Sequence, residues 1–160
     1  MADMADQCER IVAPDDLVNP ADIRLAAMNL LARREHSVRE LKRKLAGRFP
    51  DEAQVDEVLR CLAEENLQSD TRFAESFLRQ RAGRGYGPSR IRQEMRERGI
   101  PDNDIQMALT TEAPDWSANA RRVLERKFGL EPARDIKEKA RRSRFMQYRG
   151  FSHEHFGDLI

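Results

Sequence analysis

The stretch Met95-Arg-Glu-Arg-Gly-Ile-Pro-Asp102 decides the fold, because related stretches occur twice more along the chain, as Leu45-Ala-Gly-Arg-Phe-Pro-Asp51 and Met146-Gln-Tyr-Arg-Gly-Phe-Ser-His153. A helix start and a pair of apolar residues four positions apart follow each stretch. The apolar residue at the matching place is separated from the next one by 51 positions, as Phe49, Ile100 and Phe151. A degenerate repeat that is used three times predicts tandem units of one structure.

Three helices are predicted in each repeat. Ile23, Ala27 and Leu31 have the spacing of one helical face, and Ser37-Val-Arg-Glu40 is a capping box that begins the next helix. In the second repeat, Pro88 is predicted to begin a helix and Gly99 to end it. Good helix formers dominate and the alternating pattern of strands is missing, so the fold class is all-α.

The repeat sets the expected domain boundaries. An acidic, flexible tail is expected over 1–20, followed by three-helix repeats over 21–68, 69–112 and 113–160. A unit of this size is too small to be very stable alone. Stacked units that bury a shared core are therefore expected to form an elongated, curved array.

Charges alternate in blocks, although the net charge is only +1. The ranges 33–48 and 79–98 each hold seven Lys or Arg against two acidic residues, and 121–149 holds eleven against four. Acidic stretches lie between them, over 51–75 and 102–115. Such alternation can build one basic face on a nearly neutral molecule, whereas the net charge argues against a generic DNA-coating protein.

The N-terminal segment and the cysteines bear on the compartment. No run of 18 apolar residues occurs, and Met1 to Asp16 lacks the apolar core of a signal peptide. Cys8 and Cys61 lie outside any CxxC motif, and two free thiols fit a reducing compartment better than a disulfide framework does. A cytoplasmic protein without a membrane span is therefore expected.

Patterns for catalysis or metal binding are missing from the sequence. It contains no GxSxG, no HExxH and no Walker loop. His153-Glu154-His155 has no supporting Cys or carboxylate pattern, so these histidines and His36 are interpreted as ordinary surface residues. The chain is expected not to be an enzyme and to need no metal or cofactor.

The most distinctive segment is RAGRGYGPSRIR, from Arg81 to Arg92. Its glycines let the backbone approach a partner closely, and its arginines can contact phosphate or carboxylate. Tyr86 can stack on a base or fill a pocket. The alternative is a tight turn between helices with solvated arginines and a packed Tyr86. The residues alone leave both interpretations open.

Basic runs recur on the middle helix of every repeat. Solvated surface is the default for any one residue of such a run. Several cations along one surface, however, would neutralise phosphates additively and make binding sensitive to salt. The residues predicted to contact a partner or DNA are Lys42, Arg43, Arg81, Arg84, Tyr86, Arg90, Arg92, Arg96, Arg141, Arg142 and Arg149.

Four motifs carry a family resemblance. They are Ser37-x-x-Glu-Leu-x-x-Lys-Leu45, Asp70-x-Arg-Phe-Ala74, Gly85-Tyr-Gly-Pro-x-Arg-Ile-x-x-Glu-Met95 with the following Gly99-Ile100, and Tyr148-Arg-Gly-Phe151. In this order, and spread over residues 24–160, they resemble the RecX family. Met95 stands where Leu is usual, a change of nearly equal volume that puts nothing in doubt.

The resemblance implies modular three-helix repeats and a function in recombination, DNA repair and the SOS response. A protein of this type binds the RecA recombinase in its filament on single-stranded DNA and blocks extension of that filament. It thereby inhibits the recombinase, ATPase and coprotease activities. Double-stranded DNA is a further expected ligand, and the protein is expected to be a monomer. The resemblance carries over no catalytic residue.

Two other classes of protein stay open. The short turn from Gly85 to Pro88, which precedes Arg90, Arg92 and Arg96, also fits a helix-turn-helix protein that binds DNA without a recombinase. Sequence-specific footprints in the absence of recombinase would favour that class. A passive helical scaffold, whose charges only keep it dissolved, would instead show no salt-sensitive binding to DNA or recombinase.

Overall fold

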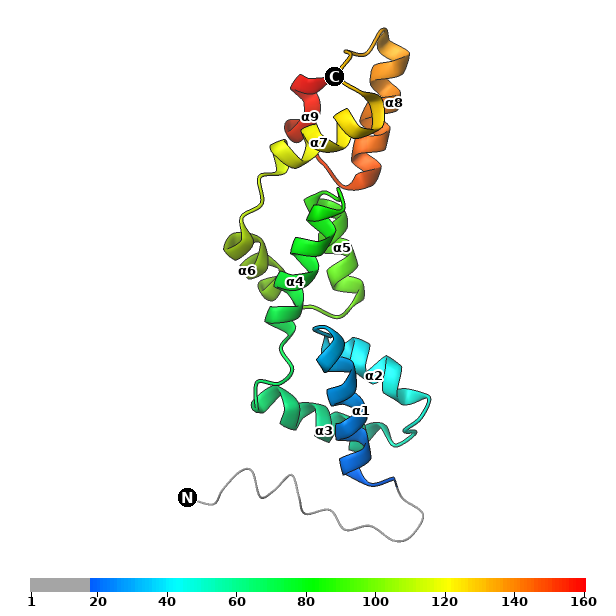
Figure 1. Cartoon of the computed structure of the whole chain (residues 1–160), viewed down its shortest axis with the longest axis vertical. Helices are drawn as coiled ribbons and strands as arrows, with labels where there is room; N and C mark the ends of the chain where they lie inside the picture. Colours follow the sequence, from blue (N-terminus) through cyan, green and yellow to red (C-terminus); the bar gives the residue numbers. More distant parts are fainter. Residues whose placement is uncertain (1–17) are drawn as a thin grey trace. The chain divides into compact units, whose positions relative to one another are not determined.

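A computed structural model describes residues 18–160, and in that range it consists of helices joined by loops, without a strand (Figure 1). The acidic tail expected over 1–20 lies almost wholly outside these residues, as does Cys8. The described helices are α1 (Pro20–Arg33), α2 (Val38–Ala46), α3 (Glu52–Glu64), α4 (Asp70–Gly83), α5 (Pro88–Glu97), α6 (Asp102–Glu112), α7 (Trp116–Phe128), α8 (Ile136–Arg149), α9 (His153–Phe156) and the 3-10 helix η2 (Gly157–Leu159).

The all-helical class and the three tandem three-helix repeats are confirmed. The repeats comprise α1–α3, α4–α6 and α7–α9. By its internal contacts the chain divides into two compact units, of which one ends at Phe73 and the other begins at Ala74. The division falls inside α4, so the first repeat belongs to one unit, and the third repeat and most of the second belong to the other.

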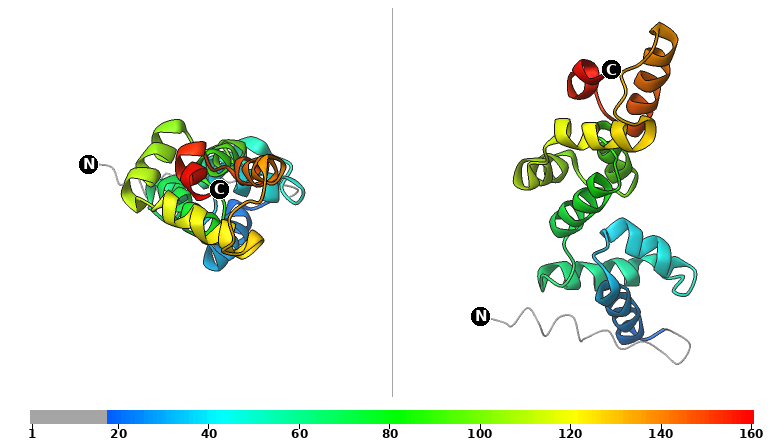
Figure 2. Two further views of the ribbon diagram at one scale, coloured as in Figure 1. Left: turned by 90° about the horizontal axis from the view of Figure 1, so that it is seen from above. Right: turned by 45° about the horizontal axis from the view of Figure 1, so that its top comes forward.

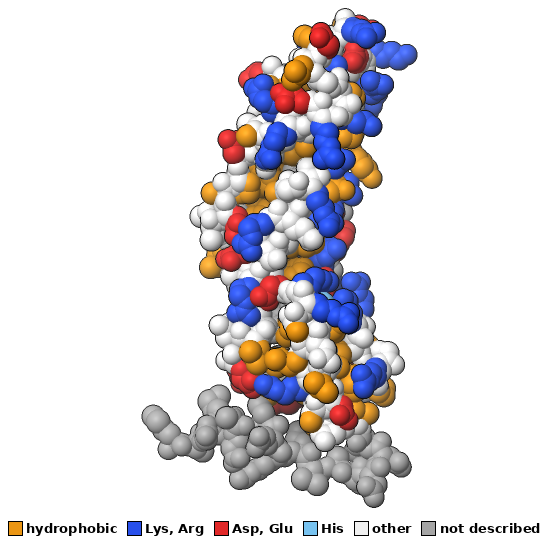
Figure 3. Space-filling model, in the orientation of Figure 1, with side chains coloured by type: hydrophobic (Ala, Val, Ile, Leu, Met, Phe, Trp, Pro, Cys, Tyr) orange, Lys and Arg blue, Asp and Glu red, His pale blue; other side chains and the backbone are white. Residues whose placement is uncertain are grey.

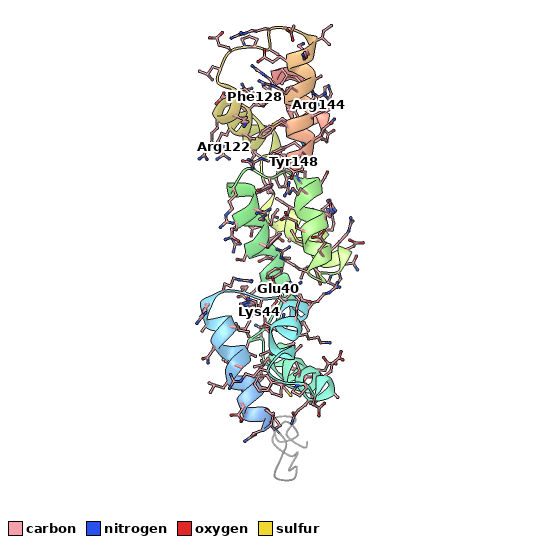
Figure 4. The ribbon with its side chains drawn as sticks, turned by 90° about the vertical axis from the view of Figure 1, so that its right-hand side faces the viewer. Glu40, Lys44, Arg122, Phe128, Arg144 and Tyr148 are labelled. Carbon is pink, nitrogen blue, oxygen red and sulfur yellow. The ribbon has the colours of Figure 1, made fainter. Side chains whose placement is uncertain are left out.

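In the first unit, α1, α2 and α3 pack around a core that includes the fully buried Ile23, Leu41 and Leu62. The predicted capping box is present: the Ser37 hydroxyl accepts from the amide of Glu40, whose carboxylate accepts from the amide of Ser37. Glu40 and Lys44 follow each other along α2 (Figure 4). The predicted helix start and the predicted spacing of apolar residues therefore agree with the structure of this repeat.

In the second unit, Pro88 begins α5 as predicted. Leu78 on α4, Ile91 on α5 and Ile105 on α6 are fully buried. In the third repeat, α7, α8 and α9 pack against one another (Figure 2). Their buried core consists of Ala120, Leu124, Met146, Phe151 and Phe156. α8 begins at Ile136, and the side chain of Asp135 just before it accepts from the Glu138 amide.

Two interpretations of single residues are wrong. Cys61 is disulfide-bonded and buried on α3, so it is not a free thiol; disulfides form between residues that are close in space and need no CxxC spacing. His36 is only 1% exposed and is therefore not a surface histidine. Its Nδ1 lies 3.0 Å from the carbonyl oxygen of Arg34, and its Nε2 lies 3.2 Å from Nζ of Lys44.

Candidate basic binding site

The loop between α4 and α5 joins the second repeat to the third through backbone contacts. The amide of Gly87 donates to the carbonyl of Arg149 at 2.8 Å, and the amide of Ser89 donates to that of Gly150 at 3.1 Å. A Cβ on Gly87 would lie 2.4 Å from the carbonyl carbon of Gly150. Gly150 has φ +99° and ends α8, a conformation that favours glycine. Gly87 of the predicted motif thus serves close packing inside the protein.

Tyr86, in the same loop, is surrounded by arginines. The guanidinium carbon of Arg81 lies 3.8 Å from the centre of its ring, that of Arg90 4.7 Å and that of Arg149 4.9 Å. Each is within the distance at which a cation is attracted to an aromatic face. Four residues predicted to bind a partner are therefore brought together, and there they bind each other.

Glu94 on α5 holds two of these arginines in place. Its carboxylate accepts from Nε and Nη2 of Arg81 at 2.7 and 2.6 Å and from Nε of Arg90 at 3.2 Å. Burial alone would raise the pKa of Glu94, but the bonds to Arg81 and Arg90 outweigh it and hold that pKa below its ordinary value. The carboxylate therefore stays ionised and offsets one of the three positive charges around Tyr86.

A basic pocket of about 560 Å³ opens beside this cluster. The end of α4 and its following loop form one side, α7 forms another, and Phe145 and Arg149 of α8 contribute the rest. Within the described chain, all of the charged residues that line it are cationic: Arg84, Arg122, Arg126, Lys127 and Arg149. Several cations without a lining carboxylate form a site for an anionic group, such as a phosphate or a carboxylate.

Three cations of this pocket were not predicted, namely Arg122, Arg126 and Lys127. They lie within the basic range 121–149, but the prediction chose residues from the following helix instead. The spacing of Arg122 and Arg126, four positions apart and therefore on one helical face, was a signal that could have found them. In the structure, Arg122 donates to the side-chain oxygen of Asn119, which directs it along that face.

The other predicted residues of α5 make polar contacts away from the pocket. Arg92 donates to the side-chain oxygen of Gln106 at 3.1 Å, and Arg96 pairs with Asp102 at 2.8 Å. Both partners belong to α6. In the first unit, Lys42 pairs with Asp56 at 2.6 Å and Arg43 is exposed on α2. Within the second unit, Arg92 and Arg96 thus contact α6 and not Tyr86.

On α8, the predicted neighbours Arg141 and Arg142 have different surroundings. Arg142 is only 4% exposed. Its guanidinium donates to the carbonyl of Glu131 at 2.9 Å and to the carboxylate of Glu138 at 2.8 Å. Arg141 is exposed. Arg142 thus fastens the segment before α8 to the helix, whereas Arg141 is available at the surface.

Arg141 belongs to an exposed face of α8. Lys137, Arg141, Arg144 and Tyr148 have helical spacing and are all exposed. Lys and Arg side chains gather over α8 in the space-filling view (Figure 3), and Arg144 and Tyr148 follow each other along the helix in Figure 4. We call these four residues the α8 face. Together with the pocket it can bind a polyanion.

The described residues were compared with the patterns of metal sites and of membrane-spanning helices. Over residues 18–160, no group of His, Cys, Asp and Glu side chains is arranged to hold a metal ion. In the same range no helix combines the length and the apolar character needed to cross a membrane.

Comparison with known families gives three consecutive matches. Residues 24–60 match the model of the first three-helix domain of RecX, residues 69–109 that of the second, and residues 115–157 that of the third. The first, second and third RecX domains therefore match this chain in that same order.

Whole-chain comparisons agree with these matches. The chain is 44% identical over 144 residues to the regulatory protein RecX of Pseudomonas entomophila, covering 90% of this chain and 93% of the relative. It is 50% identical over 130 residues to the regulatory protein RecX of Halorhodospira halophila, covering 81% of each. A crystal structure of RecX from Lactobacillus salivarius has a similar fold, with a TM-score of 0.69 at 22% identity, covering 88% of this chain and 94% of that one.

Proposed function

Because this chain belongs to the RecX family of regulatory proteins, we propose that it is a negative regulator that binds the RecA filament on single-stranded DNA. The observation that carries the proposal is the series of three RecX domain matches in order. Regulation of RecA is what membership of the family implies. The protein acts in the cytoplasm as a monomer that blocks filament extension and inhibits the recombinase, ATPase and coprotease activities, with no catalysis of its own.

The basic pocket and the α8 face are the surfaces that we propose for contact with the filament. A nucleoprotein filament presents phosphates along its DNA and carboxylates on its protein, and both are ligands of arginine. The pocket supplies cations from α4, α7 and α8 without a lining carboxylate in the described chain. Arg81 and Arg90 are held by Glu94 and support this surface from within.

Inhibition follows if binding favours one filament state over another. A ligand shifts an equilibrium only by the difference between its affinities for the two states. A regulator that binds subunits in an arrangement other than the extended, ATP-bound one lowers the population of that arrangement. Binding at substoichiometric amounts is sufficient when the regulator stands at the growing end and stops further addition.

The test is the DNA-dependent ATPase activity of RecA on single-stranded DNA, titrated with the full chain. The wild type is expected to suppress hydrolysis. The variant Arg122→Glu/Arg126→Glu, which reverses two charges of the pocket, is expected to need at least tenfold more protein for the same suppression. Arg121→Glu is the matched control, because Arg121 is exposed on the same helix but does not line the pocket.

The outcomes separate the function from its site. Suppression that is equally strong for the double variant keeps the function and removes the pocket from it. If the wild type has no effect even in excess over its cognate recombinase, the proposed function is wrong. Sequence-specific footprints on DNA without recombinase would then favour the helix-turn-helix class.

A further inference from the structure

Tyr148 is a large aromatic residue that the fold leaves at the surface. Its exposed fraction is 73%, whereas Phe151 and Phe156, which follow it in the third repeat, are 2% and 0% exposed. A tyrosine in an interior would hide its ring and satisfy its hydroxyl. The exposure of Tyr148 therefore has no explanation in the packing of its own repeat.

The ring of Tyr148 is nevertheless supported on one side. The guanidinium carbon of Arg90 lies 4.9 Å from the ring centre. Arg90 is itself fixed, because it donates to the carboxylate of Glu94 at 3.2 Å and to the backbone carbonyl of Tyr148 at 3.3 Å. An aromatic ring with a held cation on one face and a high exposed fraction has its other face available to a flat ligand.

The surroundings of Tyr148 select an anionic ligand. Lys137, Arg141 and Arg144 continue the α8 face away from it, and no acidic residue belongs to that face. Tyr148 lies eleven positions after Lys137, which corresponds to a length of about 16 Å along a helix. A row of cations that ends at an exposed aromatic ring is the combination by which proteins bind single-stranded nucleic acid, since cations follow the backbone and rings stack on bases.

We propose that Tyr148 stacks on an unpaired base of single-stranded DNA while Lys137, Arg141 and Arg144 contact the phosphates beside it. The bases inside a duplex are stacked on each other and offer no free face, so this site distinguishes single-stranded DNA from the interior of a duplex. The inference deepens the proposed function by naming the surface that receives the DNA of the filament. Its test needs no recombinase, so the two can fail separately.

Tyr86, the residue predicted to stack on a base, does not compete for this role. Its ring already has three guanidiniums within 5 Å, from Arg81, Arg90 and Arg149. A base could reach it only by displacing arginines that Glu94 holds. Tyr148 shares Arg90 with Tyr86, and of the two it is the exposed ring.

The experiment measures binding of the full chain to a fluorescent thymine oligonucleotide and to a blunt duplex of the same length, by anisotropy. Tyr148→Ala is expected to weaken binding to the single strand by about fivefold to a hundredfold, the range found for loss of one stacked base. Tyr148→Phe keeps the ring and is expected to stay within about twofold of the wild type. Gln147→Ala is the control, an exposed neighbour on another side of α8. Duplex binding should not change in any of the three.

A second variant separates stacking from charge. Arg141→Gln/Arg144→Gln removes two cations of the α8 face and is expected to weaken binding to both DNA forms. The slope of log affinity against log salt for the single strand should become shallower by about 1.4, the value for two lost phosphate contacts. Tyr148→Ala should leave that slope unchanged, because the ring carries no charge.

Three results would overturn the proposal. The first is no measurable binding of the wild type to single-stranded DNA at low salt. The second is an equal effect of Tyr148→Ala on both DNA forms, or no effect on either. The third is a loss with Tyr148→Phe as large as that with Tyr148→Ala, since the hydroxyl and not the ring would then be responsible. A variant that inhibits RecA less but binds DNA normally would point to a protein contact instead.

Discussion

Two corresponding loops of this chain are each held to another segment of the chain, but by different kinds of contact. In the first repeat, the loop between α1 and α2 meets the segment that begins α4 through side chains: Asp70 accepts from the Val38 amide at 3.0 Å, and Gln68 donates to the His36 carbonyl at 3.2 Å. In the second repeat, the loop between α4 and α5 meets the end of α8 through its backbone. We call the first contact the side-chain joint, which lies within the first unit, and the second the backbone joint, which lies within the second unit.

The two joints differ in how well they tolerate substitutions. A side-chain joint can be altered one group at a time, because each hydrogen bond is removable without moving the chain. A backbone joint cannot be altered in this way, because its contacts are made by backbone atoms that every residue has. Those atoms can approach each other only because glycine lacks a Cβ. The second joint should therefore be the more sensitive of the two to small substitutions.

The largest effect is expected from Gly87→Ala. Its new Cβ would lie 2.4–2.5 Å from backbone atoms of Gly150 and Phe151, which cannot move as a flexible side chain can. The free energy of unfolding is expected to fall by about 3 kcal/mol, as for severe overpacking. Thermal and urea unfolding followed by circular dichroism would measure it.

Gly47→Ala is the control for this prediction, because a Cβ at Gly47 in the first repeat meets nothing within 4 Å. It should be neutral or slightly stabilising. Equal effects of the two substitutions would contradict the idea that the second joint depends on close approach of backbones.

The next largest effect is expected from Glu94→Gln, which loosens the arginines around Tyr86. The carboxylate bonds to Arg81 and Arg90 would be replaced by weaker neutral ones inside a half-buried cluster. We expect a loss of about 2 kcal/mol in the free energy of unfolding. Glu97→Gln, an exposed position on the same helix, should change little. If Glu94→Gln changes stability as little as Glu97→Gln does, the cluster adds nothing to stability.

Asp70→Ala tests the side-chain joint of the first repeat. It removes the acceptor for the Val38 amide and for the Gln68 side chain. The expected loss is about 1.5 kcal/mol, smaller than at Gly87 because water can reach part of the site. Asp70→Asn retains one acceptor oxygen and should recover part of the loss. If Asn is as damaging as Ala, charge and not hydrogen bonding is what matters there.

The smallest effect concerns pH and the buried His36 of the same joint. Burial lowers the pKa of His36 below its ordinary value, partly opposed by the hydrogen bond with the Arg34 carbonyl. The unfolded chain then binds a proton more readily, so stability falls as pH drops below about 6.5 toward the lower pKa of the folded state. Subtracting the pH profile of His36→Gln from that of the wild type should isolate this slope, and a flat difference would contradict it.

Local features of the fold could be predicted from the sequence. The capping box at Ser37, the start of α5 at Pro88 and the repeat marked by Phe49, Ile100 and Phe151 depend on neighbours in the chain, and sequence periodicity records such neighbours. The curvature of the array and the exact domain boundaries stay predictions.

The candidate site was less accessible to prediction because it depends on contacts between distant residues. Tyr86 and Arg149 meet only after the second and third repeats have packed, and no local pattern reports that meeting. Arg142 did carry a signal: it precedes the buried Met146 by four positions, which places it on the inner face of α8. The burial of Arg142 was missed because the prediction followed the general rule that arginines lie at the protein surface.

The backbone joint also has a consequence for synthesis of the protein. A ribosome delivers the second repeat long before it delivers the residues at positions 149 and 150. Until those residues have left the exit tunnel, the amides of Gly87 and Ser89 lack the carbonyls that they bind in the finished structure. The first repeat can close early, as N-terminal parts commonly do. The second must wait for translation to run well beyond it, which leaves its loop open to chaperones and proteases during that interval.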